Sequence, residues 1–380
     1  MSTSTACTRS SETTKKTLFP PPQKNDLTTC PPNDLSSKRP KTYTMLHGHG
    51  DDLHAYTDIK ANFSSNIYTQ FDHEPLYRYV ANHLEAIEAY PEPTPDRLEG
   101  ELAEKLGIRP EEICITNGAT EAIYLIAQAF RRARTAVLQP TFAEYADACR
   151  MHEHRVRFIY HIDDLPADAE TLWLCNPNNP TGSVTAKQRI QQTIETAPQT
   201  TIVMDHSYDC FTREPLLTVD EALAHENVLL LHSLTKRFAV PGLRIGYVTG
   251  QAPLIERIRQ QRMPWSVNQV AVIATHYLIQ HSRDYYCDVN ALMEERMRMA
   301  RKLSATGVVD VWPSDSHILL CKLRIGRAGA LKEYLAKEHG LLIRDASNFP
   351  GLSAEFFRIA IQTPQADDFL VHAIEEWAAL

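Results

Sequence analysis

Short, nearly continuous apolar segments constrain the fold of this chain more than any other feature of its sequence. Stretches with apolar residues at helical spacing lie between most of them. The six clearest segments are 111–116, 135–140, 171–177, 201–208, 227–234 and 243–250. A strand that is apolar on both sides has to be buried on both faces, and such strands alternating with helices form a mostly parallel sheet between two helical layers. The pattern therefore predicts an α/β fold with a large, helix-covered sheet.

The pattern changes after about residue 270. One long helical stretch, 267–305, leads to two shorter strand-like segments, 317–323 and 357–362, with helical segments between and after them. These features indicate a second, smaller α+β domain. The expected parts are a tail, an N-terminal segment that contributes to the small domain and the substrate site, a large domain, and a helix leading into the small C-terminal domain: 1–44, 45–85, 86–270 and 271–380.

Residues 1–44 differ from the rest of the chain. They are rich in Ser, Thr and Pro, have no hydrophobic period, and carry seven basic against three acidic side chains. A segment of this composition buries too little apolar surface to offset the entropy of ordering it, so we expect a disordered tail. It is either an extension before a start at Met45 or a targeting or docking arm.

The net charge and the lengths of the apolar runs argue against several classes of protein. The formal net charge is -8, whereas nucleic-acid-binding domains are usually basic. No run of about 18 apolar residues is present, so no transmembrane helix is expected, and the N-terminus lacks the apolar core of a secretion signal. The eight cysteines include no C-x-x-C pair, which favours reduced thiols, a cytoplasmic location and no metal site.

Polar side chains gather where the predicted strands end, at the edge of a parallel sheet where ligands bind. Lys236 follows one of these strands, and a lysine shielded from water there can act as a nucleophilic amine. Ser233 and Arg244 flank it and suit a phosphate, through a hydroxyl and a guanidinium fork. Taken alone, Lys236 could equally be an ordinary solvated lysine on a loop.

Three further segments add polar groups to the same edge. In NPNNP (176–180), Asn179 precedes a proline, which keeps its backbone extended, and its amide can donate to a phenolate-type oxygen. Asp205 ends a hydrophobic strand, where a carboxylate needs a cationic partner, and Tyr208 follows three residues later. In TNGAT (116–120), a strand gives way to a helix whose first N–H groups form an anion site. Each segment alone is also consistent with a turn or a helix cap.

Taken together and in this order, the four segments resemble the fold-type-I pyridoxal-phosphate enzymes of the aminotransferase class I and II superfamily, over about residues 45–380. The resemblance implies pyridoxal 5'-phosphate as the cofactor and Lys236, Asp205 and Tyr208 as catalytic residues. Lys236 would bind the cofactor through its amine. Asp205 would pair with the pyridinium nitrogen so that the ring acts as an electron sink. Asn179 and Tyr208 would hydrogen-bond the phenolic oxygen of the ring.

The same resemblance implies the remaining contacts with the cofactor. Phe142, in PTFAEY, would stack on the ring. Tyr90 would reach the cofactor phosphate of a neighbouring subunit, because enzymes of this kind are homodimers with shared active sites. The residues that would hold the phosphate within the chain are Gly118, Ala119, Thr120, Ser233 and Arg244.

Several features suit a substrate that carries two anionic groups. The body begins MLHGHGDD (45–52), followed by KANFSSNIY (60–68), and Arg344 and Arg358 lie on neighbouring strand-like segments. With RQQRMPWSVN (259–268), these features are similar to the threonine-phosphate decarboxylases of cobalamin biosynthesis. Such a lyase converts O-phospho-L-threonine to (R)-1-amino-2-propanol O-2-phosphate and carbon dioxide. The substrate-binding residues that this resemblance implies are His49, Gly50, Asn66, Asn179, Arg344 and Arg358.

Two departures and several alternatives remain. HGHG stands where that family usually has a sequence nearer to HGGN, and Ile67-Tyr68 replaces an Asn-Pro pair. The nearest alternative is a histidinol-phosphate aminotransferase or a related aminotransferase, and the more distant one is a cofactor-binding regulator of the same fold. HGHG could also be a plain loop or a metal site, and Arg344 could form a structural ion pair.

Overall fold

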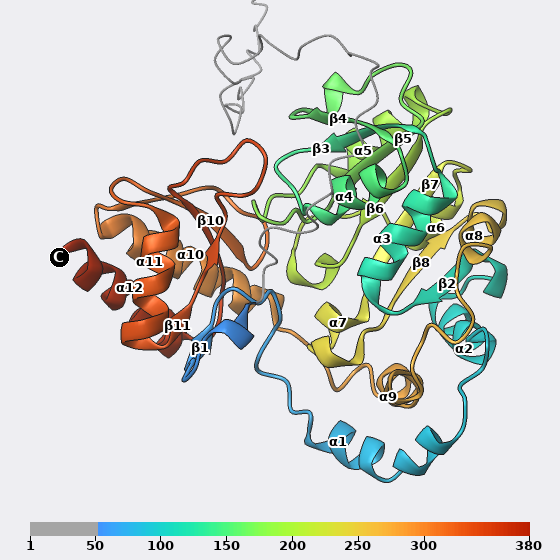
Figure 1. The fold of residues 1–380 in the computed structure, drawn as a ribbon, viewed down its shortest axis with the longest axis horizontal. Helices are drawn as coiled ribbons and strands as arrows, with labels where there is room; N and C mark the ends of the chain where they lie inside the picture. The colour runs from blue at the N-terminus through green and yellow to red at the C-terminus, as the bar shows by residue number, and fades with distance from the viewer. Residues whose placement is uncertain (1–51) are drawn as a thin grey trace, which may run out of the picture. The chain divides into compact units, whose positions relative to one another are not determined.

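Each of the six apolar segments contains a strand of one seven-stranded sheet (Figure 1). The computed structural model describes residues 52–380, so the predicted tail 1–44 and the candidate site residues His49 and Gly50 lie outside it. The strands are β2 (Ile113–Thr116), β3 (Arg134–Leu138), β4 (Arg155–Ile159), β5 (Thr171–Cys175), β6 (Thr201–Asp205), β7 (Val228–Ser233) and β8 (Gly246–Gly250).

The strand order of this sheet is β2-β8-β7-β6-β5-β3-β4. Strands β4, β3, β5, β6 and β7 run parallel, whereas β8 is antiparallel to both of its neighbours, β2 and β7. The predicted mostly parallel α/β sheet is therefore confirmed. The carboxyl ends of β5, β6 and β7 lie at one edge, and the segments after them are brought together there.

Alternate residues along the central strands face opposite helical layers. On β5, Leu172 and Leu174 pack with α5 (Lys187–Thr196) and α6 (Val219–Leu223). Trp173, between them, packs in the cluster that includes α3 (Gly118–Ala129), α4 (Glu144–Met151) and α8 (Ala252–Arg259). All residues of β5 are buried. Coverage on both faces explains why the strand has no polar side in its sequence.

A smaller, antiparallel sheet follows in the C-terminal part. Its order is β12-β13-β10-β9. Its strands are β9 (Val309–Val311), β10 (Ile318–Leu323), β12 (Arg344–Asp345) and β13 (Phe356–Ala360), and its helices are α10 (Val289–Ala305), α11 (Ala328–Tyr334) and α12 (Pro364–Ala378). The short strand β1 (Ala61–Asn62) pairs in parallel with β11 (Leu341–Leu342), which lies beside this part of the fold. The exact domain boundaries stay a prediction.

The single helical stretch expected over 267–305 is wrong, because the structure divides it in two. Helix α9 (Gln269–Gln280) ends before a polar segment, and α10 begins after Asp288. The Asp288 side chain accepts hydrogen bonds from the backbone N–H groups of Asn290 and Ala291, so it caps a new helix. Hydrophobic periodicity alone did not reveal this cap.

Strand β4 was not predicted from the sequence. It lies at the edge of the large sheet, where the exposed Arg155 and Arg157 alternate with more buried neighbours. Exposed charged side chains are typical of edge strands, and they interrupt the apolar run that identifies a central strand. The remaining helices are α1 (Glu74–Ala81), α2 (Asp96–Leu106) and α7 (Leu234–Arg237). Within residues 52–380, none of the helices combines the length and the apolar character that crossing a bilayer requires.

Candidate active site

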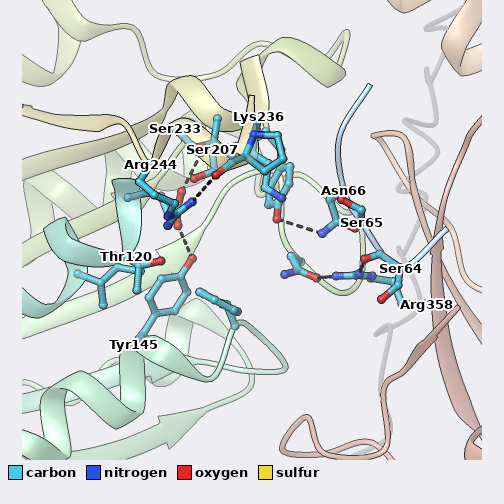
Figure 2. A pocket seen from close by; sticks show the side chains of 18 residues that line it. Ser64, Ser65, Asn66, Thr120, Tyr145, Ser207, Ser233, Lys236, Arg244 and Arg358 are labelled. Carbon is cyan, nitrogen blue, oxygen red and sulfur yellow. Dashed lines mark hydrogen bonds between the residues drawn. The ribbon is translucent and has the colours of Figure 1, made fainter. Parts of the chain in front are cut away.

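A cavity of about 350 Å³ lies beside the carboxyl ends of β6 and β7. Figure 2 shows Thr120, Arg244 and Ser233 on one side of it and Asn66 and Arg358 on the other. Residues far apart in the sequence therefore meet at one place. The predicted site residues that line the cavity are Asn66, Ala119, Thr120, Phe142, Asn179, Asp205, Tyr208, Ser233, Lys236, Arg244 and Arg358.

Lys236 stands on α7, directly after the fully buried strand β7. The short helix turns the chain at the sheet edge and brings the lysine side chain to the cavity. Its Nζ lies 5.9 Å from the centre of the Tyr208 ring. The amine therefore lies at the cavity beside an aromatic ring, where it can act as a nucleophile or a proton carrier.

Asp205 ends β6 and is only 5% exposed. Its Oδ2 accepts a hydrogen bond of 2.6 Å from the Tyr145 hydroxyl, and its Oδ1 accepts one of 2.8 Å from the backbone N–H of Ser207. No ion pair to this carboxylate is found within residues 52–380, although its burial predicted a cationic partner. Two hydrogen bonds stabilise the carboxylate within the chain, and a cationic ligand would complete its environment.

The turn between β2 and α3 forms a cradle for an anion. Gly118 has φ +82°, and a Cβ atom there would lie 2.7 Å from Nη2 of Arg244. Gly246 also allows a close approach, because a Cβ on it would lie 2.7 Å from the backbone nitrogen of Ala119. Only glycine lets the guanidinium and the helix start approach this closely. The N-terminus of α3, Ser233 and Arg244 therefore line the same end of the cavity, as a phosphate site requires.

The opposite wall is built from hydrogen-bond donors that are fixed by the chain itself. Arg358, on β13, is 2% exposed; its Nη1 donates to Oδ1 of Asn179 at 2.7 Å, and its Nη2 donates to the carbonyl oxygen of Ser64. Asn62 Oδ1 accepts the backbone N–H groups of Ser64 and Ser65, which shapes this loop. The loop and β13 thus hold Arg358 in one orientation at the cavity.

Tyr208 remains a phenol at this site. Burial raises its pKa well above the usual range, and its oxygen accepts a hydrogen bond of 3.0 Å from Nδ2 of Asn66. Its own proton is therefore available for donation to a ligand. His317 lies beside Tyr208, and burial together with the charges of Lys236 and Arg358 lowers its pKa to about 3, so it is neutral.

Of the predicted site residues that the structure describes, Gly118, Arg344 and Tyr90 do not line the cavity, and Gly118 lies instead against the Arg244 guanidinium. Arg344 on β12 lies directly opposite Arg358 on β13, so the two side chains leave the same face of the sheet. Its Nη2 donates to Oδ1 of Asn348 at 3.0 Å, and burial lowers its pKa. Tyr90 is 88% exposed, and its ring lies 5.8 Å from that of Trp265. Arg344 is therefore one strand away from the cavity, and Tyr90 faces outward.

Several lining residues were missed by the sequence reasoning. The sequence pattern predicts no role for Tyr145, in PTFAEY, although it stands three residues after Phe142, about one helical turn further along the chain. The other additions are small or apolar residues without a chemical signature of their own: Ser64, Ser65, Ile123, Ser207, Thr235 and Pro241. Their proximity to the site depends on how the loops fold.

The lining residues fit pyridoxal phosphate group by group. An amine is present for the aldehyde, a buried carboxylate for the pyridine nitrogen, and an aromatic ring, Phe142, for stacking. The glycine cradle with Arg244 suits the phosphate. Three cationic side chains against one carboxylate favour an anionic cofactor and substrate. A volume near 350 Å³ is at the lower end of the range of small-molecule sites, about 300 to 1,000 Å³.

Comparisons with known proteins place the chain among relatives of two activities. The model of the family "Aminotransferase class I and II" matches residues 58–374. A threonine-phosphate decarboxylase of Salmonella typhimurium is 28% identical over 83% of this chain and 91% of its own length. A histidinol-phosphate aminotransferase of Caldanaerobacter subterraneus is 30% identical over 76% of this chain and 84% of its own length. The crystal structure of L-threonine-O-3-phosphate decarboxylase from Porphyromonas gingivalis superposes with a TM-score of 0.82 and 34% identity, covering 84% of this chain and all of that one.

Proposed function

The chain belongs to the aminotransferase class I and II family, and from this premise we propose that it decarboxylates O-phospho-L-threonine in the cavity beside Lys236. Membership confirms the predicted fold-type-I architecture, the enzymatic nature of the chain and pyridoxal 5'-phosphate as its cofactor. The proposed products are (R)-1-amino-2-propanol O-2-phosphate and carbon dioxide.

The observation that carries this proposal is the wall opposite the phosphate cradle. Arg358 and Asn66 offer donors there, and Asp205 at the cofactor side is the one carboxylate among the lining residues of the described chain. Arg344 adds a second buried cation on the adjacent strand. A substrate with two anionic groups matches this charge distribution better than one with a cationic side chain.

Some residues of the chain would bind the cofactor, and one of them would also transfer a proton. Bound pyridoxal phosphate supplies an electron sink for the bond that breaks at Cα. Lys236 would bind the cofactor and later deliver a proton from Nζ to Cα of the product. Asp205 would hold the pyridine N–H, and Asn179 and Tyr208 would donate to the phenolic oxygen.

Arg358 would decide which bond breaks. Its guanidinium is held by the Asn179 amide oxygen and the Ser64 carbonyl, so an anion bound to it has a defined direction. By holding an anionic group of the substrate, Arg358 would orient the substrate carboxylate for loss as carbon dioxide. Catalysis by orientation of this kind depends on a rigid anchor. Arg344 and the N-terminal His49 and Gly50 would complete the contacts with the substrate.

A homodimer with shared sites belongs to the same proposal. Tyr90, Met263 and Trp265 are large side chains that are more than half exposed and close in sequence or in space. Exposed apolar side chains that gather in this way are typical of protein interfaces. In the dimer, Tyr90 would reach the cofactor phosphate in the partner's cavity.

A histidinol-phosphate aminotransferase is the second candidate, because a relative of that name is 30% identical. The same cofactor residues would serve it, and a phosphate-bearing amine would use the same donors. It differs in needing an amino acceptor, and its amino donor substrate has no carboxylate beside the amine. That difference makes the two candidates separable by product analysis.

The test is turnover of O-phospho-L-threonine by the purified full chain with pyridoxal phosphate and no keto acid. Catalytic release of carbon dioxide with aminopropanol phosphate is the expected result. Glutamate formed from histidinol phosphate and 2-oxoglutarate, without carbon dioxide from phosphothreonine, would refute the decarboxylase and support the aminotransferase.

A further inference from the structure

A tyrosine with no role in the sequence analysis holds the carboxylate at the cofactor side of the cavity. The Tyr145 hydroxyl donates to Oδ2 of Asp205 at 2.6 Å, a length typical of a hydrogen bond to a charged acceptor (Figure 2). We propose that Tyr145 is a positioning residue, which orients the Asp205 carboxylate toward the pyridine nitrogen of the cofactor and moderates its negative charge.

The ring of Tyr145 is itself fixed in place. It is 1% exposed and stacks on Trp173 with a centroid distance of 5.7 Å and an interplanar angle of 28°. The Phe142 ring meets it edge-on at 5.8 Å. Phe142 is the residue expected to stack on the cofactor. The same aromatic cluster therefore positions both the ring expected to stack on the cofactor and the hydroxyl that donates to Asp205.

The hydroxyl remains a donor at all working pH values. Burial and the adjacent Asp205 raise the pKa of Tyr145 well above the usual range, so the phenol keeps its proton. The second carboxylate oxygen, Oδ1, is held by the backbone N–H of Ser207 at 2.8 Å. Each oxygen thus has one fixed donor, and the carboxylate cannot rotate without breaking a hydrogen bond.

These two hydrogen bonds offset part of the cost of burying the carboxylate and leave it able to pair with a cationic ligand. Loss of the hydroxyl would leave more negative charge on Asp205 and fewer constraints on its orientation. Additional negative charge nearby favours the protonated form of groups on the cofactor. The inference rests on the proposed function only in its choice of substrate, since Tyr145 acts on the cofactor side.

The test compares Tyr145→Phe with a matched control, Tyr124→Phe. Tyr124 donates to the Glu144 carboxylate at 2.7 Å, so the control removes the same kind of hydrogen bond, outside the cavity lining. Apparent pyridoxal-phosphate affinity is measured by absorbance titration of the cofactor-free protein. The pH midpoint of the bound cofactor's absorbance and the kinetics with O-phospho-L-threonine are then compared.

For Tyr145→Phe we expect about threefold to tenfold weaker cofactor binding, because a carboxylate that has lost its fixed donor has to be ordered again when it meets the pyridine nitrogen. The absorbance midpoint should move to higher pH, and kcat should fall while KM changes little. Tyr124→Phe should match the unmodified chain in all of these. Cofactor affinity and midpoint unchanged in Tyr145→Phe would overturn the inference, whatever happens to turnover. Absence of turnover in the unmodified chain would instead refute the proposed function, while the cofactor titrations still decide the role of Tyr145.

Discussion

Replacing Arg358 by alanine tests the proposed substrate anchor most directly. The side chain is 2% exposed, so water cannot fully replace its contacts with a bound anion. Truncating one partner of a buried, hydrogen-bonded charge pair costs about 2 to 5 kcal/mol. At about 1.4 kcal/mol per factor of ten, kcat/KM for O-phospho-L-threonine should fall about 30-fold to a few thousand-fold.

The local contacts favour the upper part of this range. Without the guanidinium, the Asn179 amide oxygen loses its 2.7 Å donor and the Ser64 carbonyl loses another. Asn179 is also expected to touch the cofactor, so its release should lower kcat as well as raise KM. Arg358→Lys keeps the charge but removes the fork, and we expect its kcat/KM to lie between those of the alanine variant and the unmodified chain.

The assay is steady-state release of carbon dioxide, with cofactor absorbance as a check on the site. Arg324→Ala is the matched control, because Arg324 is an exposed arginine of the C-terminal part that pairs with Asp310. It should leave the kinetics unchanged. A kcat/KM of Arg358→Ala within about threefold of the unmodified value would contradict the reasoning, because truncating one partner of a buried charge pair costs about 2 kcal/mol or more, which is about 30-fold.

Three further changes test the cofactor side and the stability of the fold. Lys236→Ala should abolish turnover but leave weakened cofactor binding by absorbance titration; a fully active variant would refute the proposed role. Gly118→Ala should weaken cofactor binding about tenfold or more, since a Cβ at φ +82° lies 2.7 Å from Arg244 Nη2. An unchanged cofactor affinity would contradict the proposal that this turn and Arg244 bind the phosphate. Burial and the adjacent Glu295 carboxyl raise the pKa of Asp367 to about 8. The folded state then keeps a proton that the unfolded chain has lost above its usual pKa of 3.8, so stability falls as the pH rises toward 8. Asp367→Asn should reduce this decline in urea unfolding at pH 5 and pH 8, and an equal decline in both proteins would argue against the raised pKa.

Much of the fold and of the cofactor side could be predicted because the signals are local. A strand buried on both faces has to be apolar over several consecutive residues, as β5 is, and polar residues directly after such strands have to lie at the sheet edge. Asp205 and Lys236 follow this rule, one ending β6 and the other following β7. Their approximate places did not depend on knowing the order of the strands.

The sequence by itself thus determined the class of fold and the residues at the strand ends, since each depends on a few consecutive residues, and its resemblance to a known family implied the cofactor. Tertiary structure alone decided that Tyr145 donates to Asp205, that Asn179 and Ser64 hold Arg358, and that Arg344 lies one strand away from the cavity. These contacts join segments that are 14 to 294 residues apart in the chain. They depend on sheet order, register and loop path, which follow from packing of the whole chain and leave no local periodicity in the sequence.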